Sequence, residues 1–491
     1  MPTLPPLNNE WLIEGHITAP VARTGSLTRG PQHLQQLNSI TLHESDLVTV
    51  EREVADAFHD YLVFTTTDRA DRIYVDARPQ SDALSVTINT ERFIVVLAGL
   101  NQFVVFRTLG GNDMIHIADE VTRPILVDAG EGDDDIRSGG GYSRIFAGPG
   151  NDAILTRRGA SYIEAGEGAD QVIALGDGDM TVYAGPGNDR VVAGRGMAFI
   201  NGGGDDDHLT GASAQTILVG GPGNDALQAG SGPTVLYTGD GLDVATQLKP
   251  DDKVFANPGS GISAAGHFIA HGLTSADTLP ACAPSRTQVT DVSPISLDHT
   301  GVRVIGSPQF QQRVNDDLQQ LAGSPNGKKM FEALYAAELR SGTPINIYEL
   351  QDETNGMFAP SNPPMPPSTT QGDMAGTPVY GGAVYYNPSY IGNRMSNVPL
   401  FYHELCHAYN AVTGSRLPGE SEDGEDGNKP RPMIANIELQ AVGLPTQAMP
   451  FDFDHDPSTP PTNTNPAEFT ENGIREELGM PLRKQYSSPP I

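Results

Sequence analysis

From about residue 60, short apolar runs alternate with polar turns. The runs YLVFTTT, DRIYVDA, LSVTINT, FIVVLAG and FVVFRT are rich in Val, Ile, Phe and Tyr, a pattern typical of β-strands. The longest apolar run, Phe93 to Leu100, is far too short to span a bilayer. The pattern therefore predicts β structure and no membrane insertion.

A repeat follows these strands. Turns of the form Gly-x-Gly-x-Asp recur as AGEGDDD, AGPGND, AGEGAD, AGPGND, NGGGDDD, GGPGND and TGDGLD, with their aspartates 17 to 19 residues apart. That period is the length of one strand–turn–strand–turn coil, so the repeat predicts a parallel β-solenoid. The final aspartates of the seven turns are Asp134, Asp152, Asp170, Asp189, Asp206, Asp225 and Asp243.

These turns resemble the RTX repeat, which implies a β-roll with Ca²⁺ between successive turns. Glycine permits positive φ in such turns, and carboxylate and carbonyl oxygens are the ligands that Ca²⁺ prefers. Only one of the two turns in each coil carries the aspartate, since the half-way turns read AGRG and AGSG. We therefore expect any calcium in a single column along one edge. The alternative is a metal-free solenoid whose turns serve geometry alone.

From about residue 300 the pattern becomes helical. SPQFQQRVNDDLQQLAG and SPNGKKMFEALYAAELRSG predict two helices, and PINIYEL and GGAVYYNPSY predict two strands. A further helix is predicted in SNVPLFYHELCHAYNAVTG, where Asn397 can cap the start, Pro399 is tolerated in the first turn and Gly414 can end it. This order of elements indicates a small α+β domain.

The chain is thus expected to be multidomain. We expect a flexible leader over residues 1–55, which would serve export or targeting or be a poorly ordered terminus, and a solenoid over 56–255. A cap and linker over 256–305 and an α+β domain over 306–491 follow.

The helix predicted around residue 400 carries the motif His-Glu-x-x-His. His403 and His407 lie one turn apart on one face, where both imidazoles can bind one zinc ion. Glu404 beside them can hold the attacking water and take its proton. The alternative is a pair of histidines packed in a core.

A catalytic zinc needs a third protein ligand. The metzincin pattern is excluded, because Asn410 and Thr413 stand where its Gly and His would be. Glu438, the only carboxylate in the predicted helix RPMIANIELQAVGLP, lies among apolar residues where an unpaired charge would be costly. His455 in FDFDHD is the alternative third ligand.

Four stretches of the C-terminal part resemble the M91 family of bacterial type III secreted effector metalloproteases: VYYNPSY, HELCHAYNAVTG, IELQAVGLP and FTENGIREELGMPLR. The resemblance implies a zinc-dependent, zincin-like endopeptidase that acts on host signalling proteins. It implies His403, His407 and Glu438 as zinc ligands and Glu404 as the base.

More distantly, HELCHA with a later ELxxxG is similar to clostridial neurotoxin light chains. Those enzymes use an Arg-x-x-Tyr pair to stabilise the oxyanion, and Arg483 and Tyr486 have that spacing here. An ordinary polar C-terminal segment is the alternative. Cys406, between the two histidines, is expected to be a small buried residue, and Cys282 is assigned no role.

The composition limits the classes of partner that the chain can bind. The formal charge is −31, from 61 acidic and 30 basic residues, which argues against nucleic acid and anionic membranes. No basic start followed by an apolar core is visible, so we expect secretion without a Sec signal and delivery into the host cytoplasm. The oligomeric state is left open.

The sequence therefore predicts an effector zinc endopeptidase with one Zn²⁺, a host protein substrate and a solenoid for docking or delivery. One alternative is a calcium-binding structural or adhesive protein with an inactive peptidase domain; the retained Glu404 argues against it. A zinc hydrolase that acts on non-peptide bonds is a second alternative, because the ligands alone do not set specificity.

Overall fold

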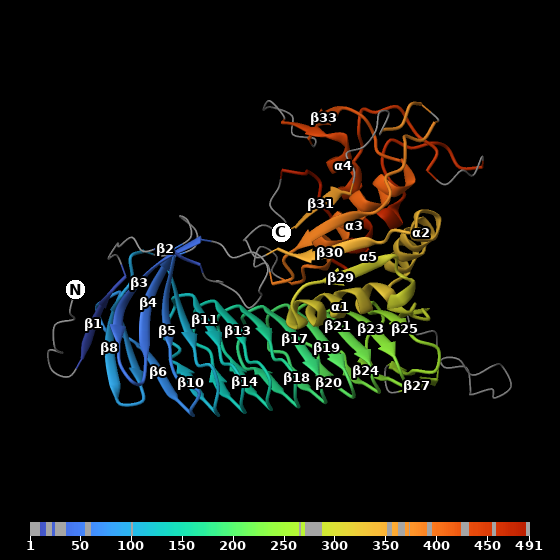
Figure 1. The fold of residues 1–491 in the computed structure, drawn as a ribbon. Helices are drawn as coiled ribbons and strands as arrows, with labels where there is room; N and C mark the ends of the chain where they lie inside the picture. The colour runs from blue at the N-terminus through green and yellow to red at the C-terminus, as the bar shows by residue number, and fades with distance from the viewer. Residues whose placement is uncertain are drawn as a thin grey trace. The chain divides into compact units, whose positions relative to one another are not determined.

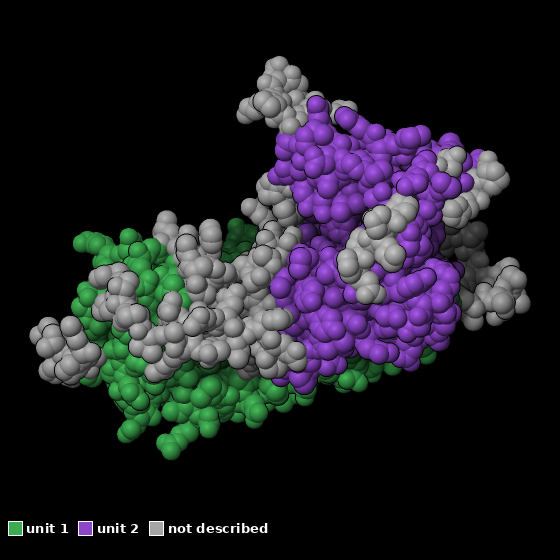
Figure 2. All heavy atoms as spheres, turned by 45° about the horizontal axis from the view of Figure 1, so that its top comes forward, with its two compact units in different colours: residues 1–27, 34–290 green, residues 28–33, 291–491 purple. Residues whose placement is uncertain are grey.

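The structure is a computed structural model of the 491-residue chain. It describes residues 10–15, 22–24, 36–54, 60–99, 102–264, 267–270, 287–350, 356–361, 369–372, 374–389, 395–423, 432–453 and 458–487. The chain divides into two compact units, one of residues 1–27 and 34–290 and one of residues 28–33 and 291–491 (Figure 2).

The first unit is a solenoid of two 14-stranded sheets, in which successive coils stack from β9 to β25 (Figure 1). The strands of one sheet, in spatial order, are β1 (Trp11–Glu14), β8 (Glu91–Val96), β7 (Leu84–Ile88), β6 (Arg72–Ala77), β10 (Met114–Ile117), β12 (Asp135–Arg137), β14 (Ala153–Thr156), β16 (Gln171–Ala174), β18 (Arg190–Val192), β20 (His208–Thr210), β22 (Ala226–Gln228), β24 (Val244–Leu248), β26 (Gly261–Ala264) and β27 (His267–Ala270). The strands of the other are β2 (Ala22–Thr24), β3 (Gln36–Glu44), β4 (Thr49–Val54), β5 (Asp60–Thr65), β9 (Phe103–Arg107), β11 (Ile125–Asp128), β13 (Ser143–Phe146), β15 (Ser161–Glu164), β17 (Met180–Pro186), β19 (Ala198–Gly204), β21 (Thr216–Pro222), β23 (Thr234–Asp240), β25 (Lys253–Ala256) and β28 (Gln288–Asp291).

The register explains why an 18-residue repeat forms this fold. Parallel pairing places the same position of each coil directly over the last, so Ile145 lies opposite Ile163 and Ile163 opposite Val182. These rows are fully buried and form one continuous apolar core between the two sheets. Each coil buries its apolar side chains mainly against its neighbours, as expected for a repeat protein. The predicted parallel β-solenoid is confirmed.

Glycines make the close stacking of turns possible. Gly150 has φ of 149°, and a Cβ there would overlap the carbonyl oxygen of Gly132 in the preceding coil. An L-residue with a side chain would both strain the backbone and separate the two coils.

Antiparallel strands close the N-terminal end of the solenoid. Strands β3, β4 and β5 pair antiparallel on one sheet, as do β6, β7 and β8 on the other. Residues 36–54 therefore form strands where a largely unstructured leader was expected. The side chains of Val48 and Val50 join the solenoid core, which gives this segment apolar burial that its mixed composition concealed.

The second unit is an α+β domain, as predicted. Its four-stranded sheet has the order β29 (Val302–Ile305), β30 (Ile345–Glu349), β32 (Gly382–Tyr386) and β31 (Gly356–Pro360). The first three strands run parallel, and the edge strand β31 is antiparallel to β32. A separate hairpin joins β33 (Glu420–Glu422) and β34 (Met433–Ala435).

Helices pack around this sheet (Figure 1). They are η1 (Leu297–His299), α1 (Pro308–Ala322), α2 (Pro325–Ser341), α3 (Val398–Thr413), α4 (Asn436–Val442), η2 (Ala467–Phe469) and α5 (Glu471–Glu477). Helix α3 contacts α2, α4, α5 and the strands β31 and β32, so it is the central element of the unit.

The ends of α3 follow the sequence signals with one exception. Gly414 has φ of 72° and ends the helix in the left-handed conformation, and Pro399 lies in the first turn. Asn397 stands at the cap position, but its side chain donates to the carbonyl oxygen of Pro388 instead of capping the helix. The hydroxyl of Ser396 accepts from the amide of Val398.

Candidate functional site

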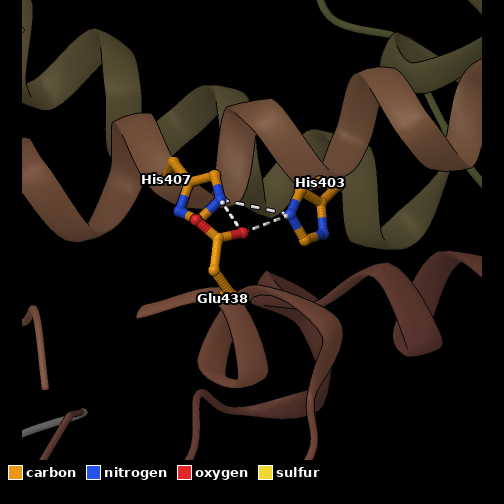
Figure 3. A group of neighbouring side chains, drawn as sticks. All are labelled: His403, His407 and Glu438. Atoms are coloured by element: carbon orange, nitrogen blue, oxygen red, sulfur yellow. Dashed lines mark hydrogen bonds and ion pairs between the residues drawn. The ribbon is translucent and has the colours of Figure 1, made fainter. Parts of the chain in front are cut away.

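Three side chains from two helices meet in the second unit. His403 and His407 project from one face of α3, and Glu438 reaches them from the first turn of α4 (Figure 3). The two histidine Nε2 atoms are 3.1 Å apart, and Oε2 of Glu438 lies 3.4 Å from Nε2 of His403 and 3.2 Å from Nε2 of His407. We call these three residues the metal group.

These distances suit a metal ion. Ligands about 2.0–2.1 Å from a tetrahedral zinc are about 3.3–3.4 Å from one another, close to the 3.1–3.4 Å among the three atoms. Three atoms with lone pairs this close repel one another unless a proton or a cation lies between them. Two imidazoles and a carboxylate are also a donor set that catalytic zinc sites use. The residues present therefore fit zinc.

The electrostatics of the group show the same demand for positive charge. Burial favours neutral His403, but its hydrogen bonds to Glu438 and Glu471 outweigh burial and raise its pKa to about 10. Burial also opposes the charge of Glu438, yet the two histidines hold its pKa well below the usual range. Without a metal, the metal group binds a proton on His403, and that proton supplies the positive charge that a metal ion would supply.

Glu471 supports the group from behind, a role that sequence reasoning missed. This fully buried carboxylate lies at the start of α5, and its Oε2 is 3.2 Å from Nδ1 of His403. Arg475 and Arg483 also donate to it, at 2.7 and 2.9 Å. Burial raises the pKa of Glu471, but these partners outweigh burial and lower it to about 2.

A carboxylate at Nδ1 fixes the tautomer of His403, so that its Nε2 lone pair faces the other members of the metal group. The only sequence signal for Glu471 was its place in the stretch FTENGIREELGMPLR, which carries the M91 resemblance.

Glu404 packs against the edge strand of the sheet. A Cβ placed on Gly356, the first residue of β31, would lie 3.0 Å from Cγ of Glu404. Its charge also acts on His403 and on Tyr486, raising the pKa of both groups. The motif residue therefore lies within electrostatic range of the metal group and against a strand that has one free edge in the described sheet.

The structure also brings Arg483 and Tyr486 to this site. The Tyr486 ring lies 6.3 Å from that of His403, and burial together with the Glu438 carboxylate raises the pKa of its hydroxyl. The Arg483 guanidinium lies 5.2 Å from the centre of the Tyr486 ring. Arg483 also donates to Glu471 and to the backbone carbonyl of Tyr486. The Arg483 guanidinium is therefore held by Glu471 and by the Tyr486 backbone.

The remaining candidates are quickly placed. Cys406 is fully buried in α3, and burial raises the pKa of its thiol well above the usual value, so it is an inert packing residue. His455, the alternative third ligand, and Cys282 lie outside the described residues.

A second set of buried carboxylates runs along one edge of the solenoid. The amide of each aspartate donates to Oδ1 of the aspartate in the next coil, over distances of 2.7–3.0 Å. All members are at most 3% exposed. We call this set the aspartate column; it comprises Asp71, Asp113, Asp134, Asp152, Asp170, Asp189, Asp207, Asp225 and Asp243.

The second oxygen of each interior carboxylate has no hydrogen-bond partner within the described residues. Burial raises the pKa of these groups to about 7 for Asp152, about 8 for Asp189 and about 9 for Asp207. A buried carboxylate with one unpartnered oxygen is stabilised by a proton or a cation at that oxygen. These orphan oxygens therefore fit Ca²⁺; they belong to Asp113, Asp134, Asp152, Asp170, Asp189, Asp207 and Asp225.

Asp206, one of the seven aspartates predicted from the sequence, lies outside the column. Asp206 is exposed and accepts from the amide and side chain of Asn224, at 2.7 and 3.0 Å, whereas Asp207 occupies the column. The sequence held a clue, because choosing Asp206 produced one interval of 17 residues followed by one of 19. Choosing Asp207 makes both intervals 18.

The column also extends further than predicted. The amide of Asp113, in the turn LGGND, donates to Oδ1 of Asp134, and the amide of Asp71 donates to Oδ1 of Asp113. At both ends the terminal carboxylate is satisfied by neighbouring side chains. Asn89 donates to Asp71 at 2.5 Å, and the hydroxyl of Ser260 donates to Oδ2 of Asp243 at 3.1 Å.

Comparison with known families agrees with both sites. Residues 298–486 match the peptidase family M91. The M91 family model is described as an effector protein, and the matched region contains the whole metal group, Glu404, Glu471, Arg483 and Tyr486. The M91 resemblance seen in the sequence is confirmed, and the match supports a peptidase.

The solenoid matches a second family. Five segments match the RTX calcium-binding nonapeptide repeat, namely 128–163, 146–180, 164–196, 183–215 and 217–245. No curated protein and no solved structure matches the chain. Among the described residues, no helix combines the length and the apolar character needed to cross a membrane.

Proposed function

We propose that this chain is an effector zinc endopeptidase that hydrolyses a peptide bond in a host signalling protein. His403, His407 and Glu438 would hold the zinc, and the solenoid would serve docking or delivery. The observation that carries the proposal is the convergence of three ligand atoms, 3.1–3.4 Å apart, within a region that matches family M91.

Bound zinc would supply Lewis acidity toward the scissile carbonyl and lower the pKa of water at the site. Glu404 is the proposed general base, because it follows the first ligand on α3 and faces the site's edge strand. It would hold the attacking water and take its proton, then give that proton to the departing amine.

Tyr486 is the proposed oxyanion-stabilising group. Its raised pKa keeps the hydroxyl protonated, so that it can donate a hydrogen bond to the developing negative charge. We assign Arg483 a positioning role, because its guanidinium is held by Glu471 and by the Tyr486 carbonyl. The sequence suggested an oxyanion role for Arg483 and Tyr486 together, and we propose that role for Tyr486 alone.

The aspartate column would hold Ca²⁺ in the solenoid. The orphan Oδ2 atoms of its interior members support this assignment, together with the RTX match. Such binding would stabilise the solenoid where calcium is abundant and leave it less stable in a low-calcium bacterial cytosol. We propose that this difference accompanies secretion without a Sec signal and delivery into host cytoplasm.

Elemental analysis of the purified chain tests the metal centre. We expect about one zinc in the wild type and in Glu404→Gln, and none in His407→Ala. His208→Ala, which removes an exposed histidine of the solenoid, is the matched control and should keep its zinc. Zinc retained by His407→Ala would contradict the ligand assignment.

Labelling of new protein N-termini in a eukaryotic cell lysate tests the reaction. Wild-type protein should generate new termini that Glu404→Gln does not. Equal sets of termini from the two proteins would refute a peptidase that uses Glu404 as its base, whatever the metal content.

A further inference from the structure

We infer that Asp423 is a positioning residue for Tyr486. It holds the backbone of the C-terminal segment where the Tyr486 ring lies 6.3 Å from that of His403. The inference rests on the proposed function, and it concerns a residue of the acidic stretch SRLPGESEDGEDGNKP, which follows α3 in the sequence.

Both carboxylate oxygens of Asp423 accept hydrogen bonds from the C-terminal segment. Its Oδ1 accepts the amide of Tyr486 at 2.6 Å, and its Oδ2 accepts the amide of Ser487 at 2.8 Å and the hydroxyl of Ser487 at 2.5 Å. The residue is 3% exposed. Hydrogen bonds to a charged acceptor are among the stronger ones in proteins, so three on one carboxylate fix the segment firmly.

Asp423 is itself fixed to the element that carries a metal-group residue. It follows β33, and its amide donates to the carbonyl of Pro432 just before β34. Strand β34 leads directly into α4, with Glu438 in its first turn. Ser421 of the same hairpin also donates to the side chain of Asn436 at 2.5 Å. The carboxylate therefore belongs to the α4 side of the site.

The segment from Arg483 to Tyr486 is thus held at both ends by different elements. At its start, Arg483 pairs with Glu471 of α5, and Asn472 of α5 also bonds its backbone. At its end, Asp423 binds the amide of Tyr486. Without the second attachment, the Tyr486 backbone would keep only the contact of its carbonyl with Arg483, and its ring could move away from His403.

Cobalt substitution in the full chain tests this placement directly. Co²⁺ broadens the ¹⁹F resonances of nearby fluorotyrosines in a protein labelled with 3-fluorotyrosine. The chain has 15 tyrosines, so the Tyr486 signal is assigned by its absence in Tyr486→Phe. Tyr402, which precedes His403 in α3, is the internal reference for bound metal.

We expect Co²⁺ to broaden both signals in the wild type. In Asp423→Ala, the Tyr486 broadening should be lost while the Tyr402 broadening persists. Asp423→Asn, which keeps one acceptor oxygen, should retain part of it, and Glu420→Ala, an exposed carboxylate on the same hairpin, should behave as wild type.

Two results would overturn the inference. Broadening of the Tyr486 signal that survives in Asp423→Ala would show that Asp423 does not position the tyrosine. Loss of both signals' broadening in Asp423→Ala and Asp423→Asn would assign the residue to the metal site itself. Absence of any broadening in the wild type is distinguishable from both results. It would reject the proposed metal centre together with the positioning role of Asp423.

Discussion

The aspartate column and the metal group both place buried ligand atoms against one another, but they are assembled in opposite ways. In the column, one residue type recurs at one position of every coil, and each member contacts the next, mostly 18 residues away. In the metal group, two members share a helix and the third comes from a different helix, 31 residues after His407.

The comparison shows what each arrangement demands of its surroundings. The column needs little support, because each carboxylate is positioned by a backbone amide that the repeat itself supplies. The metal group needs a supporting layer, in which Glu471 orients His403 and Asp423 holds the segment that carries Tyr486. We therefore expect single substitutions to act locally in the column and through several residues in the metal group.

The largest effect should follow loss of the base. Glu404→Gln should lower the rate of peptide-bond cleavage by about 10²- to 10⁴-fold, because general-base catalysis supplies about that factor. The measurement is the cleavage rate of a substrate found through its new N-terminus, with zinc content measured in parallel. A rate within a few-fold of wild type would show that another group takes the proton.

Loss of the support for His403 should act on the metal. Glu471→Gln should weaken zinc binding by about 10- to 100-fold, the usual cost of removing a partner of a ligating histidine. Competition with a chelator of known affinity measures the change. Glu476→Gln, an exposed glutamate on the same helix, is the control. Unchanged zinc affinity in Glu471→Gln would indicate that helix packing alone orients His403.

Calcium-free solenoid should lose stability as pH rises. The pKa values of the column members from Asp113 to Asp243 are raised from 3.8 to between about 6 and about 9, so the folded state binds more protons than the unfolded state above pH 4. The stabilisation is therefore present at low pH and is lost as pH rises through 6 to 9. We expect the melting temperature to fall by at least about 5 °C between pH 5 and pH 8.

Millimolar Ca²⁺ should reverse most of this loss at pH 8, because the cation replaces the protons. Far-UV circular dichroism during heating measures both effects. A melting temperature that is independent of pH and calcium would mean that the column carries neither protons nor calcium.

The smallest expected effect separates two neighbouring aspartates. Asp207→Ala leaves the amide of Asp189 without its acceptor, at a cost of about 1–3 kcal/mol, whereas Asp206→Ala changes an exposed residue and should cost about 0.5 kcal/mol. Hydrogen exchange of peptides covering residues 183–215 should rise in the first variant alone. Equal exchange in both would contradict the assignment of Asp207 to the column.

Much of the solenoid was predictable, because its contacts repeat at a fixed interval. Seven in-phase turns were enough to give the coil length, the parallel pairing and six members of the column. The errors arose where the interval changed. Asp113 lies 21 residues before Asp134, and the double aspartate at 206 and 207 offered two registers. The strands before residue 55 have no repeat and were missed altogether.

The metal group was predictable in part for a different reason. The spacing of His403 and His407 is set by one helix, and Glu438 was the only carboxylate in its segment. Glu471 and Asp423 lie 68 residues after and 63 residues before the residues they hold, so no local pattern connects them. Only the folded chain shows that these carboxylates meet His403 and Tyr486.

The column's hydrogen bonds also bear on how the solenoid can change its length. Asp170 and Asp189 are separated by 19 residues and Asp71 and Asp113 by 42, yet both pairs bond at 2.7 Å, like pairs at the usual interval. Extra residues are therefore accommodated away from the column, in the half-way turns or in an inserted hairpin. Duplication or deletion of one whole coil in the gene would restore every hydrogen bond of the column. Such solenoids can therefore become longer or shorter in evolution without changes to the sequences of their two ends.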